Sequence, residues 1–145
     1  MARLILIRHG ESVANRERRF SLDDDEPLTP EGIEQARATA RRLVARFTPV
    51  ALYSSPLARA FATAREIGSP FALEPSPIVE LREQCFGALQ GAPYERFYDI
   101  HGRSPRRPDF WRLRPEGGET LIEVASRVGP VLDRLARSHH GRDVV

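Results

Sequence analysis

A short apolar run near the start of the chain, Leu4-Ile5-Leu6-Ile7, constrains the fold most strongly. Four consecutive apolar residues without polar alternation predict a strand that is buried on both faces, as in a parallel sheet. The run continues directly into Arg8-His9-Gly10-Glu11, so charged and titratable groups stand at the carboxyl end of the predicted strand. Open α/β sheets bind their ligands at that edge. The sequence therefore predicts a functional site immediately after the first strand.

Apolar residues at helical spacing predict three amphipathic helices. Thr29 and Thr120 are the N-cap candidates of the first and the third helix, and Thr120 forms a capping-box pattern with Glu123. Gly129-Pro130 should kink the third helix. The predicted helices cover residues 30–48, 55–68 and 121–140.

Short β-prone stretches lie between and after these helices, at Val50-Ala51-Leu52-Tyr53, Phe71-Ala72-Leu73 and Asp143-Val144-Val145. Residues 75–115 are rich in Pro and Arg, which predicts mostly loop with one or two short helices, and a loop of this length suggests a lid or cap. The order of the elements, with no repeat, predicts one α/β domain over residues 1–145. Its expected architecture is a three-layer α/β/α sandwich with a mostly parallel central sheet.

The composition excludes several classes of protein. The 22 basic and 20 acidic residues leave a net charge of +2, which is too small to indicate a nucleic-acid-binding protein. A single cysteine, Cys85, excludes an internal disulfide and a metal site built from a cysteine cluster. No apolar stretch approaches the roughly 18 residues of a membrane span, and no secretory signal begins the chain. We therefore expect a cytoplasmic protein without a membrane partner.

Two charged stretches allow other interpretations. The acidic run Asp23-Asp24-Asp25-Glu26 lacks the spacing of an EF-hand and is expected to be a solvated loop rather than a metal site. Basic residues alternate with aromatic ones in a second stretch, a pattern that suits single-stranded nucleic acid. This stretch contains Arg103, Arg106, Arg107, Phe110, Trp111, Arg112 and Arg114. A solvated loop or an anion-binding lid explains the same residues, so we predict no nucleic-acid partner.

Two arginines are placed to meet at one edge of the sheet. Arg8 precedes His9 at the end of the first predicted strand, and Arg59 lies in the first turn of the helix that follows another strand. Together with these residues, five ordered segments resemble the histidine phosphatase superfamily, also called the phosphoglycerate mutase-like family. The matching segments are 6–12 with Asn15, 28–32 with 35–36, 54–60 with 63–64, 81–87 with 89–91, and 117–120.

The resemblance implies a phosphomonoester hydrolase that needs neither a metal ion nor a cofactor and acts on a small phosphorylated substrate. The residue types suit this chemistry, because the guanidinium forks of Arg8 and Arg59 match phosphate oxygens. A neutral His9 imidazole can attack phosphorus and form a phosphohistidine. Glu83 matches the family's proton donor for the leaving alkoxide, although Glu80 lies close to it in sequence. Further candidate phosphate contacts are Asn15 and, less strongly matched, Ser12 and Ser21.

The chain departs from the family pattern near its last residues. The family carries a second histidine, followed by Gly, after a late strand, and that histidine contacts the same phosphoryl group. Here the predicted late strand is Asp143-Val144-Val145, and His139 and His140 precede it and do not match. The chain is therefore expected to be C-terminally incomplete relative to the family, either as a piece of a longer protein or as a natural variant. An open sheet edge could be covered by a homodimer.

Two other functions remain open at this stage. A phosphoglycerate mutase shares the motifs, and residues 15–21 resemble the mutase segment after the histidine. Phe86, where mutases often carry Tyr, and the short stretch 91–115 favour a phosphatase instead. A catalytically impaired relative that only binds inorganic phosphate is the third interpretation. The sequence does not identify the substrate, because the residues that select it lie on variable loops.

Overall fold

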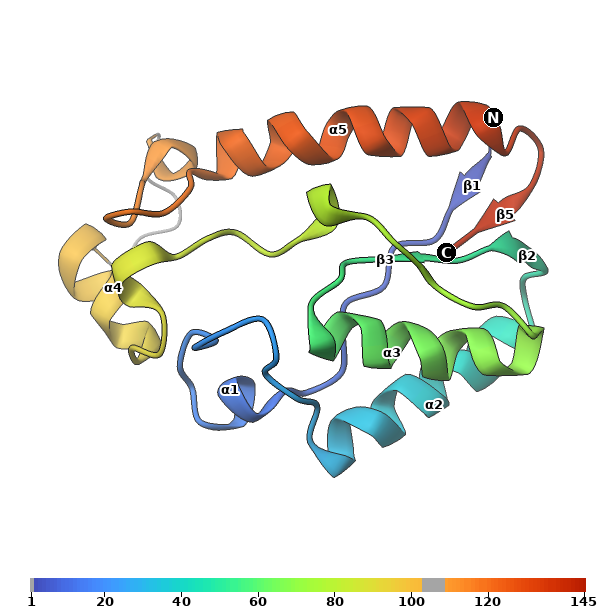
Figure 1. Cartoon of the computed structure of the whole chain (residues 1–145), viewed down its shortest axis with the longest axis horizontal. Helices are drawn as coiled ribbons and strands as arrows, with labels where there is room; N and C mark the ends of the chain where they lie inside the picture. Colours follow the sequence, from blue (N-terminus) through green and yellow to red (C-terminus); the bar gives the residue numbers. More distant parts are fainter. Residues whose placement is uncertain (1, 103–108) are drawn as a thin grey trace.

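The computed structural model describes residues 2–102 and 109–145, which form a sheet between two helical layers (Figure 1). Helix α5 (Leu121–Ser138) covers one face of the sheet. Helices α2 (Pro30–Val44) and α3 (Ala58–Gly68) cover the other face. This arrangement confirms the predicted three-layer α/β/α sandwich.

The described strands pair in parallel. Strand β5 (Asp143–Val144) lies between β1 (Arg3–Leu4) and β2 (Pro49–Ala51). Strand β3 (Tyr53–Ser54) follows β2 after a single residue and pairs with β4 (Ser76–Pro77). Because all these strands run in the same direction, the chain leaves β1 and β3 at the same edge of the sheet, as the position of the predicted site requires.

The first strand is shorter and less buried than predicted. Strand β1 ends at Leu4, although the Ile5 N–H still donates to the Val144 carbonyl at 2.8 Å. Ile5 and Ile7 pack against the core beneath α2 and α3. Leu6 is 75% exposed, so the prediction of burial on both faces is wrong there. The physical reason is a groove of about 390 Å³ that separates this face of the sheet from α5 and has Leu6 in its lining.

The stretch Phe71-Ala72-Leu73 does not form the predicted strand. A 3₁₀-helix, η1 (Ser69–Phe71), occupies its start, and Ala72 has a left-handed φ of 53°. Pro70 fixes a helical φ in this turn, and the left-handed residue then reverses the chain. Phe71 and Leu73 still pack against the core, and the strand on this side of the sheet is β4 instead.

The helices begin close to where their capping residues predict. Thr29 accepts the Gly32 N–H at 3.0 Å and starts α2, and Thr120 forms the predicted capping box with Glu123 at the start of α5. Helix α3 begins two residues later than Pro56 and has no side-chain cap. Helix α5 continues through Pro130 as one element (Figure 1).

The core lies between the sheet and the α2–α3 layer. Small side chains on α2 and α3 let the two helices approach, and larger ones fill the space toward the sheet. The buried cluster consists of Ala40, Leu43, Leu52, Ala64 and Ile67. This packing holds the start of α3 against the end of β1, which is where the site is built.

The connections on the site side are loops and short helices, and the described part of residues 75–115 contains four short helices, more than the one or two predicted. The short helices on this side are α1 (Val13–Arg16), η2 (Val79–Leu81), η3 (Gly87–Leu89), α4 (Tyr94–His101) and η4 (Phe110–Arg112). Arg103, Arg106 and Arg107 of the stretch considered for nucleic acid lie outside the described residues. Across the described chain, every helix is too short or too polar to cross a membrane.

Candidate active site

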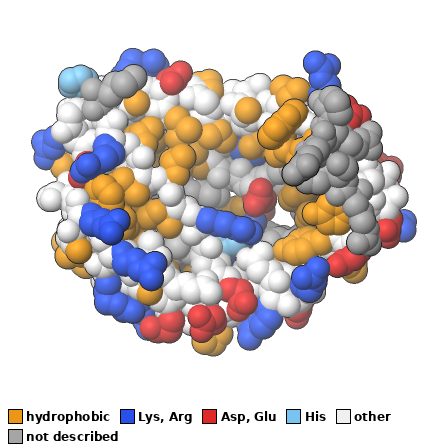
Figure 2. Space-filling model, turned by 180° about the vertical axis from the view of Figure 1, so that it is seen from behind, with side chains coloured by type: hydrophobic (Ala, Val, Ile, Leu, Met, Phe, Trp, Pro, Cys, Tyr) orange, Lys and Arg blue, Asp and Glu red, His pale blue; other side chains and the backbone are white. Residues whose placement is uncertain are grey.

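A pocket of about 700 Å³ opens where the chain leaves β1 and enters α3. Figure 2 shows a hollow in this face of the molecule, with basic, acidic and histidine side chains around it. Except for Ser12, every predicted site residue lines the pocket, and these residues are Arg8, His9, Asn15, Ser21, Arg59 and Glu83. Glu80 lines it as well. Residues far apart in the sequence are therefore brought together as expected.

One side of the pocket, the phosphate wall (residues 8–10 and 59), rests on a close contact between two glycines. A Cβ atom at Gly10 would lie 2.1 Å from the Gly32 carbonyl oxygen, and one at Gly32 would lie 2.1 Å from the Glu11 carbonyl oxygen. Backbone atoms cannot move aside as a flexible side chain does. The loop that carries His9 therefore reaches the start of α2 only because both residues lack a side chain.

Hydrogen bonds fix this loop to both helices beneath it. The Gly10 N–H donates to the Thr63 hydroxyl of α3 at 3.1 Å. The Glu11 N–H donates to the Gln35 side chain of α2 at 2.9 Å, and the Thr29 hydroxyl donates to the Glu11 carboxylate at 2.7 Å. The orientation of His9 is thus set by backbone that is anchored immediately after it.

The contacts of His9 define its tautomer. Its Nδ1 atom lies 2.6 Å from the Gly10 carbonyl oxygen. A carbonyl oxygen only accepts, so Nδ1 must carry the hydrogen, and the Nε2 lone pair of the neutral ring is left for other chemistry. Burial lowers the pKa of His9, and the positive charges of Arg59 and Arg8 lower it further. The neutral, nucleophilic form is therefore favoured.

Arg59 is the most unusual side chain of the pocket, because it is only 4% exposed. Its Nη1 atom is buried and has no hydrogen-bond partner among residues 2–102 and 109–145. An unpaired buried charged donor is costly unless an anion meets it. Arg8 lines the same pocket from the end of β1 and is exposed. The guanidinium groups of Arg8 and Arg59 both act on the charge of His9 and line the same pocket, and together they suit an anion with several oxygens.

Ser12 and Asn15 have different places in the structure. Ser12 is buried and caps α1, where its hydroxyl accepts the Asn15 N–H at 3.2 Å. It lies outside the pocket lining, and its hydrogen bonds with Asn15 hold that residue in place. The Asn15 side-chain amide lines the pocket and donates to the Tyr94 hydroxyl at 3.1 Å, which fixes its orientation. No sequence signal identified this role for Tyr94.

Ser21 lies on a loop that an ion pair holds in place. Arg19 donates to both oxygens of the Glu26 carboxylate, at 2.9 and 3.0 Å. This pair holds the pKa of Glu26 below its usual value despite some opposing burial. Glu26 is only 6% exposed, so the prediction of a solvated acidic loop is wrong at this residue. Among the described residues, no group of three or more His, Cys, Asp or Glu side chains is arranged so that it could hold a metal ion.

Aromatic rings line the side of the pocket near α4. The Phe20 ring lies 4.2 Å from the Phe86 ring and 5.0 Å from the Tyr94 ring, measured between centroids. All three residues line the pocket. They provide an apolar surface for the part of a ligand that lies beyond its anionic group.

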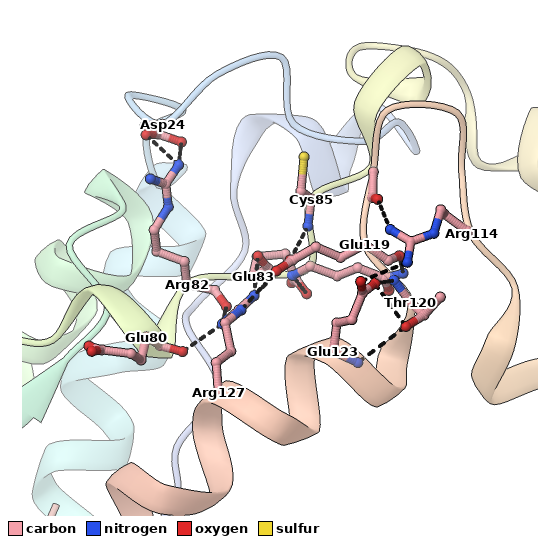
Figure 3. A network of polar contacts seen from close by, with 12 residues as sticks. Asp24, Glu80, Arg82, Glu83, Cys85, Arg114, Glu119, Thr120, Glu123 and Arg127 are labelled. Atoms are coloured by element: carbon pink, nitrogen blue, oxygen red, sulfur yellow. Dashed lines mark hydrogen bonds and ion pairs between the residues drawn. The ribbon is translucent and has the colours of Figure 1, made fainter.

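The opposite side of the pocket is the Glu83 wall (residues 79–86). Glu83 itself is exposed there, and its carboxylate accepts the Gln84 N–H at 3.0 Å. Arg82 extends from this wall to Asp24, which it contacts at 2.7 Å (Figure 3). Glu119 and Arg127 also line the pocket and contact this wall. Glu119 belongs to the matching segment 117–120, whereas no sequence signal identified Arg127.

The chain is similar to known proteins over almost its whole length. The family model of the histidine phosphatase superfamily (branch 1) matches residues 4–145. A metal-independent phosphoserine phosphatase from Arabidopsis thaliana is 31% identical over 152 residues, which cover 98% of this chain and 61% of the relative. A 2,3-bisphosphoglycerate-dependent phosphoglycerate mutase from Lactobacillus johnsonii is 38% identical over 96 residues, covering 63% of this chain and 42% of the relative.

The solved structures agree with the curated sequences. A mycobacterial glucosyl-3-phosphoglycerate phosphatase, solved in complex with VO3, superimposes with a TM-score of 0.80 at 32% identity. The match covers 95% of this chain and 71% of that one. The chain spans 61% and 64% of the length of the two Arabidopsis thaliana relatives that it matches almost throughout.

Proposed function

The chain belongs to the histidine phosphatase superfamily (branch 1), and from this premise we propose that it hydrolyses small phosphomonoesters without a metal ion. The observation that carries the proposal is the buried, unpaired guanidinium nitrogen of Arg59 beside a histidine that is held neutral. A phosphoryl group supplies the anion that Arg59 lacks, and its phosphorus offers an electrophile to His9.

In the first step, the His9 Nε2 lone pair attacks phosphorus while Arg8 and Arg59 neutralise the charge on the phosphoryl oxygens. The bond between phosphorus and the ester oxygen breaks, and its electron pair stays on that oxygen. The Glu83 carboxyl group donates a proton to the oxygen, so that an alcohol leaves. The products of this step are the alcohol, a phosphohistidine and a Glu83 carboxylate.

In the second step, water attacks the phosphohistidine. The Glu83 carboxylate takes a proton from the water, and the P–N bond breaks with its electron pair returning to Nε2. Inorganic phosphate leaves, and both His9 and Glu83 regain their starting protonation states. Neither step needs a metal ion, because the two arginines carry the positive charge.

Phosphoglycerate mutase activity is the second candidate, and the similarity to a mutase over 96 residues favours it. A mutase would return the phosphoryl group from His9 to a second hydroxyl of the substrate instead of to water. The exposed Glu83 wall and the ring of Phe86, which offers no hydroxyl, support water as the acceptor.

The test is phosphate release from phosphoserine, phosphoglycerate and p-nitrophenyl phosphate, with a chelator present. We expect release by the unmodified chain and an acid-labile phosphohistidine after rapid quenching. His9→Ala should abolish both, whereas His140→Ala, which changes an exposed histidine outside the pocket, should leave both intact. Isomerised phosphoglycerate without phosphate release would indicate a mutase. Phosphate binding without turnover would indicate the impaired relative.

A further inference from the structure

One guanidinium group holds the main chain of the Glu83 wall. Arg127, on α5, donates from Nη1 to the carbonyl oxygens of Glu80 and Arg82, and from Nη2 to that of Glu83 at 3.1 Å (Figure 3). The Arg127 side chain is only 22% exposed. Three carbonyl groups of an irregular segment thus share a single partner from a different layer of the fold.

A carboxylate completes the arrangement. Glu119 accepts from Nε and Nη2 of Arg127 at 3.0 and 2.9 Å, which is a two-pronged ion pair. The same carboxylate accepts the Cys85 N–H at 2.9 Å, and the Glu119 carbonyl accepts the Gln84 side-chain amide at 2.6 Å. The pair therefore contacts the chain both immediately before and immediately after the Glu83 side chain.

The electrostatics of the pair favour its charged form. The hydrogen bonds with Arg127 hold the pKa of Glu119 below its usual value. Opposing this, partial burial and the charge of Glu123 raise the same pKa, but they do not reverse the shift. The pair thus stays ionised throughout the neutral range.

From this geometry we propose that Arg127 and Glu119 are positioning residues that hold Glu83 in place for proton transfer. The inference rests on the proposed function, in which Glu83 donates and then accepts the proton. Only the short 3₁₀-helix η2 gives this wall any regular structure, so its place depends on contacts from outside. A proton donor works only within hydrogen-bond reach of the leaving oxygen, and small displacements cost much of its effect.

The experiment uses two esters whose leaving groups differ in their need for a proton. Phenyl phosphate releases a basic phenolate, whereas a dinitrophenyl phosphate releases a stable anion that needs little protonation. For Arg127→Met and Glu119→Gln we expect kcat/KM for phenyl phosphate to fall about 10- to 100-fold, because a misplaced proton donor loses part of the roughly 10²- to 10⁴-fold rate gain of a general acid. The value for the dinitrophenyl ester should change less than about 3-fold, because it needs no such acid.

Glu83→Gln supplies the reference for these variants. It should show the same dependence on the leaving group, and adding Arg127→Met to it should cause little further loss, because both changes act on one proton transfer. Inhibition by inorganic phosphate should stay within about 2-fold of the unmodified chain, since the phosphate wall is untouched. An equal loss for both esters would overturn the positioning role and leave a purely structural one.

Arg114→Met is the matched control. Arg114 also pairs with a glutamate of α5, contacting Glu123 at 2.6 Å, and it also donates to a carbonyl oxygen, that of Gly118. None of the hydrogen bonds described for it reaches the Glu83 wall. Both esters should therefore react at nearly the unmodified rate, and a leaving-group effect as large as that of Arg127→Met would contradict the inference.

A second measurement does not depend on turnover. Amide hydrogen exchange in residues 80–86 should accelerate in Arg127→Met and hardly change in Arg114→Met, at matched folded fractions. Arg127→Lys keeps the positive charge but loses the planar guanidinium group, so its exchange rate should be intermediate between those of the unmodified chain and Arg127→Met. This variant keeps the test possible if Arg127→Met fails to fold. Unchanged exchange in both Arg127 variants overturns the inference even if the enzyme is active. If the unmodified chain hydrolyses neither ester, the proposed function fails instead, and the positioning role falls with it.

Discussion

The two sides of the pocket are held in place by different forces. The phosphate wall is fixed by backbone contact between Gly10 and Gly32 and by hydrogen bonds within the α2–α3 layer. The Glu83 wall is fixed by Arg127 of α5, which pairs with Glu119 and donates to main-chain carbonyl oxygens of the wall. Packing and buried hydrogen bonds respond little to salt and pH, whereas partly exposed ion pairs respond to both.

In the proposed mechanism, this difference means that phosphate binding by Arg8 and Arg59 can be changed separately from proton transfer by Glu83. Changes in the α2–α3 layer should alter the affinity for phosphate or the stability of the whole domain. Changes on α5 should alter what happens to the leaving group. Each prediction below tests whether one side can be changed without the other, beginning with the largest expected effect.

Removing the buried guanidinium group should affect binding far more than folding. We expect Arg59→Met to lower kcat/KM by about 10³-fold, the upper range for loss of one preorganised donor. The melting temperature should stay constant or rise, because a buried charge without a partner is replaced by an apolar side chain of similar length. Arg65→Met, at an exposed position of the same helix, should change neither quantity. A large drop in melting temperature for Arg59→Met would show that Arg59 stabilises the fold instead.

The glycine contact should be the most sensitive point for stability. Gly32→Ala places a Cβ atom 2.1 Å from the Glu11 carbonyl oxygen, so the backbone must move. We expect a loss of about 2–3 kcal/mol in the free energy of unfolding, measured by urea titration. The control is Gly129→Ala in α5, where a Cβ atom meets nothing within 4 Å. That change should be neutral or stabilising by up to about 1 kcal/mol. Equal losses in the two variants would contradict the role of the contact.

The lowered pKa of His9 predicts the direction of the pH dependence. In the proposed mechanism the neutral ring is the nucleophile, so kcat/KM should fall on the acid side with a midpoint below about 6.5, the ordinary value for histidine. Arg8→Gln removes one of the positive charges that lower the pKa of His9 and should move this midpoint upward. An NMR titration of the His9 ring checks the same shift directly.

The same shift has a consequence for stability. The unfolded chain binds the His9 proton at a higher pH than the folded chain, so protonation favours unfolding as the pH falls below about 6.5. Replacing His9 with Gln should therefore flatten the decline in stability on the acid side of neutrality. A midpoint above the ordinary value in the unmodified protein would refute both expectations.

The smallest effect is expected at the start of α5. Thr120→Ala removes one half of the capping box and should cost about 1 kcal/mol of unfolding free energy without changing phosphate affinity. The Thr120 N–H, Arg114 and the Thr120 hydroxyl lower the pKa of Glu123 to about 2. The contribution of the ionised Glu123 to capping should therefore be fully present above about pH 4.5. It should be lost as the pH falls from about 4.5 toward 2. Melting curves of both proteins across this range provide the check.

Sequence reasoning identified elements whose signals are local. Thr29 and Thr120 marked two helix starts correctly, because capping depends on residues within one turn. The order of strands and helices gave the sandwich. The apolar run at the start indicated the position of β1 but not the exposure of Leu6. The exposure depends on the distance between this face of the sheet and α5, which local sequence does not determine.

The site was predictable to the extent that motifs define it. Arg8 and Arg59 were brought together as expected, but the burial and unpaired nitrogen of Arg59 follow only from packing in three dimensions. Ser12 matched by position, yet its hydroxyl is used for capping α1. Arg127 had no signal, since its acceptors in the Glu83 wall are main-chain carbonyl groups, which every residue type carries.

That last property has an evolutionary consequence. The contacts of Arg127 involve the main chain at positions 80 and 82, so mutations there leave the hydrogen-bond acceptors unchanged. Side chains at these two positions face the pocket and can diverge freely while the neighbouring carboxyl group keeps its place. Under the proposed function, relatives that share the Arg127 contacts could thus change their phosphorylated substrate through a few substitutions at these positions. The residues proposed to react with the phosphoryl group would stay the same.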